Sequence, residues 1–511
     1  RIALPMVGGV ITSTLMELLV YPAIFYLWRG KKLPPGTAPT TPAGTSNLPP
    51  PGPGSRRKQA LPFAATLVGA LFFIAGCAPG ATHEENDARE RAGRIGQILS
   101  TIPALPSLRE GSTPDDFLRF ALLKHPAVRA AYHEWRASIE DITPTRTLPD
   151  PRLTFETDIS SMLMSLMPGV MFEFMLPQKL SAMSREATAA SEVAYQNYAA
   201  TVLSTAAEVR QAWVELAYVD ASEQLLSDTH EALTQALDIA TSDYATARGM
   251  AGLDAPLLAM NNAAQLRLQI ATNAERRTAA RARFQSALGL LPEEGPPPWP
   301  CIPLTATSLP AEGALWERGR AANPEIATMR AMVAMALAKI EAAHQAGTPD
   351  FSLGLMADLK TSPIMYRPTA SVNLPIWREK IAAEIAAAEA RSQGALAKLD
   401  AAQLGVAAEI AQMLFMAREA ERMIAYIDNT ALPHIERAQA AVATTYQTGM
   451  APPNMLPELR IMRARMGIER LNALRQREIA VTKLLLITAT SAPHDAPLAG
   501  AQARETKPGQ D

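Results

Sequence analysis

The stretch DPRLTFETD at residues 150–158 has a counterpart, TPDFSLGLM, at residues 348–356. In both stretches apolar side chains alternate with polar or small ones, and this alternation predicts a β-strand with one apolar and one polar face. A second alternating run follows each of them, at residues 170–176 and 369–374. The sequence therefore predicts two pairs of strands, far apart along the chain.

The two strand pairs belong to two copies of one unit. Three prolines recur at a constant offset of 198 residues, and these pairs are Pro126 with Pro324, Pro151 with Pro349 and Pro177 with Pro375. The offset grows to about 200 at Gly249 and Gly449. A fixed period of this kind indicates an internal duplication.

Long helices follow both strand pairs. No Gly or Pro occurs from Gln178 to Arg248, and such a run, if continuous, predicts a helix of about 100 Å at ~1.5 Å per residue. Gly249 and Gly449 predict turns that reverse the chain into returning helices. In the second copy Pro433 predicts a kink or a break.

Four strands cannot close a membrane barrel, because the smallest such barrels have about eight and an open edge leaves backbone groups unpaired in lipid. Three chains supply about twelve strands, which allow closure around a wet lumen. The predicted fold is therefore mainly α with a small transmembrane β part, in two tandem repeats that each hold two β-strands and long helical hairpins. The predicted assembly is a homotrimer with a 12-stranded β-barrel.

Two apolar segments precede the repeats. Residues 2–28 are long enough to span a bilayer and resemble the last transmembrane helix of heavy-metal RND pumps. After a Pro-rich linker, Arg56, Arg57 and Lys58 introduce a second apolar run that ends at Cys77, which is the pattern of a bacterial secretory signal. Residues 74–77, IAGC, are similar to the lipobox of bacterial lipoproteins. This resemblance implies a covalent lipid on Cys77, and Ala78 after it implies delivery to the outer membrane.

Together these features resemble the TolC-type outer-membrane efflux protein family, over residues 113–490. The likeness rests on the lipobox, the paired repeats, strand pairs that end in Leu-Pro, and the turn from Tyr446 to Gly449. It implies a lipid-anchored trimer whose outer-membrane β-barrel continues into a periplasmic α-helical barrel. The partners implied are outer-membrane lipids, an inner-membrane RND pump and a periplasmic adaptor. No enzymatic activity and no cofactor other than the lipid are expected.

The predicted organisation divides the chain into eight segments. They are a transmembrane segment at 1–32, a Pro-rich linker at 33–54, a lipoprotein signal segment at 55–77, a periplasmic tether at 78–112, repeat 1 at 113–290, a Pro-rich inter-repeat linker at 291–313, repeat 2 at 314–490 and a disordered tail at 491–511.

Two sets of residues are candidates for contact with substrate. In the family the segment after the Tyr-x-x-Gly turn lies at the periplasmic entrance, so the resemblance implies gating acids at Asp254 and Glu458. Both acids also suit an ordinary helix start.

Methionines crowd the expected link between the first two strands, at Met162, Met164, Met167, Met171 and Met175. Their thioethers are soft ligands suited to Cu(I) or Ag(I), which would match the pump-like fragment and heavy-metal cations as substrate. Apolar packing is the alternative explanation of these side chains.

Composition excludes several other functions. A net charge of −2 without a basic cluster gives no basis for binding nucleic acid. The seven His residues lack the spacing of metal ligands, and the sequence has no phosphate loop, nucleophile elbow or Cys–His pair. Two alternatives to a channel are a periplasmic adaptor and a structural envelope lipoprotein, both with long helical hairpins.

Overall fold

A computed structural model describes residues 80–100, 108–160, 163–245, 254–300, 312–359, 364–447 and 455–489. The chain divides into two compact units, Arg1–Leu71 and Phe72–Asp511. Every described residue belongs to the second unit. The apolar segment at 2–28, Cys77 and the tail lie outside the described residues.

The structure confirms the duplication, because each copy contains a helix, two antiparallel strands and long helices in the same order. In the first copy these elements are α6 (Pro126–Glu140), β1 (Arg152–Ser160), β2 (Leu163–Phe174), α8 (Pro177–Ala245) and α9 (Asp254–Ala287). In the second copy they are α11 (Pro324–Gln345), β3 (Asp350–Asp358), β4 (Met365–Asn373), α12 (Arg378–Tyr426), α13 (Leu432–Gln447) and α14 (Met455–Ile487).

The long helices follow the sequence pattern. Helix α8 has 69 residues and contains no Gly or Pro after Pro177, so nothing in its sequence interrupts the backbone hydrogen bonds. The matching stretch of the second copy is divided by a π-helix, η3 (Ile427–Ala431), directly before α13. Pro433, in the first turn of α13, lacks the N–H that a continuous helix would use there. The irregularity predicted near Pro433 as a kink or a break is therefore a π-helix within an otherwise continuous helical stretch.

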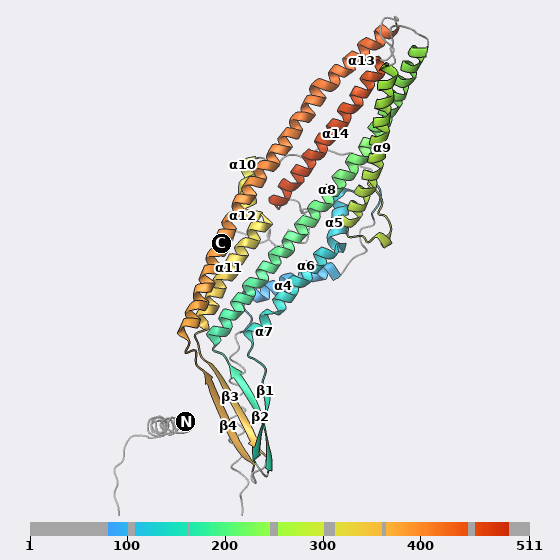
Figure 1. Cartoon of the computed structure of the whole chain (residues 1–511). Helices are drawn as coiled ribbons and strands as arrows, with labels where there is room; N and C mark the ends of the chain where they lie inside the picture. The colour runs from blue at the N-terminus through green and yellow to red at the C-terminus, as the bar shows by residue number, and fades with distance from the viewer. Residues whose placement is uncertain are drawn as a thin grey trace, which may run out of the picture. The chain divides into compact units, whose positions relative to one another are not determined.

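The helices of this unit pack along one another (Figure 1). Helix α8 contacts α9, α11 and α14, and α12 contacts α11 and α14. Buried positions recur at the repeat offset, so that Phe117 corresponds to Leu315 and Leu216 to Leu414. The same offset thus sets both the order of the elements and the positions of their core side chains.

Shorter elements cover the long helices. They are α4 (His83–Ser100), α5 (Pro114–Lys124), α7 (Ile142–Arg146), α10 (Glu312–Ala322) and the 3₁₀ helix η2 (Pro292–Glu294). Phe117 of α5 packs on Trp213 of α8 and Phe284 of α9, with ring centroids 5.3 and 5.4 Å apart. None of the helices in the described ranges combines the length and the apolar composition that crossing a membrane requires.

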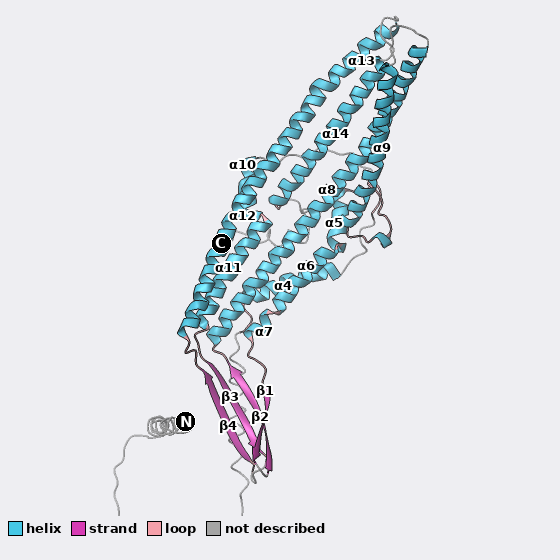
Figure 2. Cartoon of the chain, in the orientation of Figure 1, coloured by secondary structure: helices cyan, strands magenta, loops and turns pink. Residues whose placement is uncertain are grey.

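The four strands form one antiparallel sheet in the order β1-β2-β3-β4 (Figure 2). Strands β2 and β3 pair along Gly169–Phe174 and Phe351–Met356, which joins the two copies in the middle of the sheet. One prediction was wrong, because β2 begins at Leu163 and not at Val170. Residues 163–169 pair with β1 and so belong to the strand, although they were expected to form a link.

Candidate channel surface

The strand register sorts the sheet into two faces. Leu153 pairs with Val170, Val170 with Leu355, and Leu355 with Pro368, so these positions share one face. The described apolar face comprises Leu153, Phe155, Thr157, Pro168, Val170, Phe172, Phe174, Phe351, Leu353, Leu355, Ala357, Tyr366, Pro368, Ala370 and Val372. The face is continuous across all four strands.

This apolar face is unusually exposed for a protein in water. Leu153 is 64% exposed and Phe155 62%, and Leu353, Tyr366 and Val372 are exposed as well. Large contiguous apolar surfaces mark contacts with proteins or membranes. With 9 residues in β1 and 12 in β2, the strands have the length of a transmembrane β-strand, about 9–11 residues.

The opposite face carries charged and hydroxyl side chains. Arg152 pairs with Glu173 at 3.1 Å, and Ser352 and Ser371 share a hydrogen bond of 2.5 Å. A groove of about 400 Å³ lies on this face, and Thr154, Met171, Gly354, Met356, Thr369 and Ser371 are among its lining residues. This surface can face water and a passing solute.

Both edges of the sheet have free backbone groups. Within the described residues β1 pairs only with β2, and β4 pairs only with β3. Every residue of β4 is exposed. A sheet with an apolar face and two unpaired edges is incomplete in lipid, where backbone N–H and C=O groups need partners.

Ion pairs hold the long helices and the sheet together. Lys179 at the start of α8 donates to both carboxylate oxygens of Asp350 at 2.7 and 2.8 Å, which links the first copy to β3 of the second. Near the π-helix, Arg470 of α14 donates to both oxygens of Asp428 at 2.6 and 3.0 Å. The hydrogen bond to Asp428 raises the pKa of the Arg470 guanidinium.

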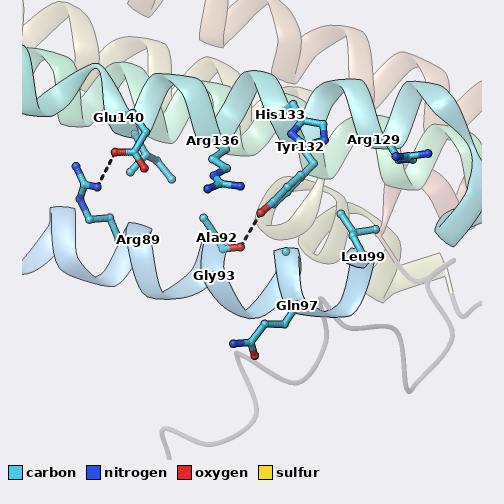
Figure 3. A pocket seen from close by; sticks show the side chains of 12 residues that line it. Arg89, Ala92, Gly93, Gln97, Leu99, Arg129, Tyr132, His133, Arg136 and Glu140 are labelled. Carbon is cyan, nitrogen blue, oxygen red and sulfur yellow. Dashed lines mark hydrogen bonds and ion pairs between the residues drawn. The ribbon is translucent and has the colours of Figure 1, made fainter. Parts of the chain in front are cut away.

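A hollow of about 530 Å³ lies between α4 and α6 (Figure 3). Along it Arg89 donates to Glu140 at 2.8 Å, and the Tyr132 hydroxyl donates to the carbonyl of Ala92 at 3.0 Å. Beside it, Ala92 and Tyr132 belong to a buried cluster that includes Tyr198 of α8. Burial there raises the pKa of Tyr198 to about 12. Part of the predicted tether at 78–112 is thus a helix fixed to the helical body.

The two predicted entrance acids begin returning helices. Asp254 is the first residue of α9, and Glu458 is exposed in the first turn of α14. Because α8 and the α12–α13 stretch lead away from the sheet and α9 and α14 return, both acids lie at helix ends remote from the strands (Figure 1).

The five methionines predicted as soft-metal contacts do not form one group. Met167 and Met171 occupy the polar face, while Met164 has the opposite parity along β2, where it pairs with Ile159. Met175 follows β2, and Met162 lies outside the described residues. Across the described ranges, no group of three His, Cys, Asp or Glu side chains could hold a metal ion.

A family model with the description "Outer membrane efflux protein" matches residues 118–290 and 315–490. These two ranges correspond to the two copies of the repeat and cover more than half of the chain. The chain belongs to the outer membrane efflux protein family. It is therefore an outer-membrane efflux channel protein, which disfavours the adaptor and the structural lipoprotein.

Several solved structures of membrane proteins share this fold. The open state of the Neisseria gonorrhoeae MtrE outer membrane channel has a TM-score of 0.63 at 17% identity, and the match covers 77% of this chain and 94% of MtrE. CusC matches with a TM-score of 0.62 at 16% identity, over 76% of this chain and 95% of CusC. VceC from Vibrio cholerae matches with a TM-score of 0.59 at 17% identity, over 74% of this chain and 96% of VceC. No curated protein matches the chain.

In this member of the outer membrane efflux protein family, the sequence predicted some of the features of the sheet and not others. The sequence predicted the alternation of the strands, but not the position of Met356 beside β2 and not the Lys179–Asp350 pair. Both contacts join the two copies, and no local pattern marks partners so far apart in the sequence.

Proposed function

We propose that three copies of this chain form a passive channel that carries substrate from an inner-membrane RND pump and a periplasmic adaptor through the outer membrane. The observation that carries this proposal is the four-stranded sheet with one apolar face, one polar face and two unpaired edges. Channels of this family work with such pumps and adaptors and form trimers.

The trimer follows from the pairing of the edges. Strands alternate in direction across the sheet, so β4 of one copy is antiparallel to β1 of the next, and three copies give an even, closed set of about twelve strands. The apolar face then contacts lipid and the polar face lines the lumen. Two copies would give about eight strands, whose interior is filled by side chains.

Heavy-metal cations such as copper or silver are the substrates we propose. The support is the likeness of residues 2–28 to the last transmembrane helix of heavy-metal RND pumps, together with methionine side chains on the polar face. Thioethers bind soft metal ions in preference to hard ones.

Two further assignments complete the proposal. A lipid on Cys77 anchors the chain in the outer membrane, as the lipobox at 74–77 predicts. Asp254 and Glu458 at the starts of α9 and α14 act at the periplasmic entrance, where carboxylates attract cations.

The proposal is tested with the purified full chain and with a deletion strain. The chain should migrate as a trimer by native mass spectrometry and give stable conductance steps in planar bilayers. The deletion strain should lose tolerance to copper or silver salts and regain it on complementation. A monomer without conductance would overturn the channel, and a strain sensitive only to organic toxicants would overturn the metal substrate alone.

A further inference from the structure

Three methionines stand out on the polar face of the sheet. Met167 and Met171 lie on β2, and Met356 lies on β3. The register places Met356 opposite Gly169, which lies between Met167 and Met171 on the same face of β2. Side chains two residues apart on a strand are about 7 Å apart, so Met167 and Met171 are about 13 Å from each other, and Met356 can approach Met171 from the neighbouring strand.

Gly169 makes room for this arrangement. A Cβ atom at position 169 would lie 2.5 Å from Cγ of Met356 and 2.9 Å from Oγ1 of Thr154. The Met356 side chain therefore lies across Gly169, in the space between Met167 and Met171. Any larger residue at 169 would push it away.

Two of these methionines are accessible from the groove on the polar face, and the third is buried. Met171 and Met356 line the groove of about 400 Å³ on the polar face, whereas Met167 is only 4% exposed. Oγ1 of Thr154 is buried beside them and has no hydrogen-bond partner in the part of the chain that the structure describes. A solute in the groove can thus reach the side chains of Met171 and Met356, with the Thr154 hydroxyl beside Met356, whereas Met167 does not line the groove.

We infer that Met171 and Met356 form a two-thioether contact site for a soft monovalent cation, of the Cu(I) or Ag(I) class. This inference rests on the proposed function, in which the polar face lines the lumen. Soft sulfur ligands select such ions over Mg²⁺ or Ca²⁺, which take oxygen ligands. Neutral thioethers also hold the ion without a fixed counter-charge, and such modest binding suits a channel, where an ion must leave as well as enter.

The inference is tested by titrating the purified trimer, labelled with methyl-¹³C methionine, with Ag(I) and following the methyl signals by NMR. Signals of Met171 and Met356 should shift together, and Zn(II) at the same concentration should leave them in place. The variant M171L/M356L should lose this Ag(I) response, and a control variant, M423L/M462L, which changes two exposed methionines of the helices, should keep it. Met-to-Leu changes conserve volume, so the trimer should remain intact.

Potassium chloride conductance of the same samples separates this site from the channel itself. Normal conductance of the wild-type protein without an Ag(I) shift at these two methyls would overturn the site and leave the proposed channel standing. Wild-type protein without conductance would overturn the channel, while the NMR titration would still decide the site. If the double variant does not assemble, the single variant M356L supplies the comparison, and an unchanged Ag(I) response of Met171 there would also overturn the site.

Discussion

Glu458 is exposed in the first turn of α14, and its charge can be removed with little change of shape. We predict that E458Q, or D254N at the start of α9, lowers the preference of the channel for cations. Three carboxylates about 10 Å from a passing cation attract it by roughly 0.4 kcal/mol each in water, so their loss lowers cation occupancy by up to about eightfold at low salt. Reversal potentials in a salt gradient measure this preference.

A suitable control is E469Q, which removes an exposed carboxylate further along the same helix. It should leave the reversal potential near that of the wild type. If E458Q and E469Q behave alike, Glu458 is only a helix-start residue, stabilised by the positive end of the helix dipole.

Some residues could be assigned from the sequence, and others could not. Leu153 and Phe155 were placed on the apolar face because alternation is a local pattern, and the register confirms that placement. The bidentate pair between Arg470 and Asp428 has no such signal, because its partners lie on different helices. The closeness of Met356 to Met171 was not predicted for the same reason, since β2 and β3 belong to different copies.

At the scale of elements, two adjacent residues on opposite faces of the sheet can test the assignment of those faces. Leu353 lies on the apolar face and Ser352 on the polar face of β3. We predict that L353R disrupts insertion, because Arg on the lipid face of a barrel costs about 2–4 kcal/mol at the midplane, and a trimer carries three copies. Heat-modifiable trimer in outer-membrane fractions measures the assembled protein.

S352R is the matched control, with the same new charge one residue away. It should assemble, because its guanidinium enters the wet lumen, and should lower single-channel conductance. Equal amounts of assembled trimer for the two variants would contradict the assignment of the faces.

The two copies of the repeat differ in their long helices. The sequence predicted the 69-residue helix α8 from the absence of Gly and Pro, and it predicted a break near Pro433 in the second copy. It did not predict the form of the break, a π-helix at Ile427–Ala431, which accommodates an extra residue in one turn. This one-residue insertion accounts for part of the growth of the repeat offset, from 198 at Pro177 and Pro375 to 200 at Gly249 and Gly449.

At the scale of the whole molecule, the proposed barrel and the proposed lipid are two separate attachments to one membrane. A single acyl chain binds membranes only marginally, whereas a closed barrel exposes its whole apolar belt to lipid. The barrel should therefore be sufficient to hold an assembled trimer, and the lipid should matter mainly before assembly, when each sheet still has unpaired edges.

We predict that C77A yields a mature chain without the acyl mass, and in smaller amount, but that the trimers it forms stay in the outer membrane and conduct normally. C301S is the matched control, because it removes the only other cysteine and should keep the lipid. Mass spectrometry of the mature chain and fractionation of the envelope provide the two measurements. A wild-type chain without acyl mass would refute the anchor, and release of assembled C77A trimers from the membrane would show that the apolar face of the sheet does not hold them there.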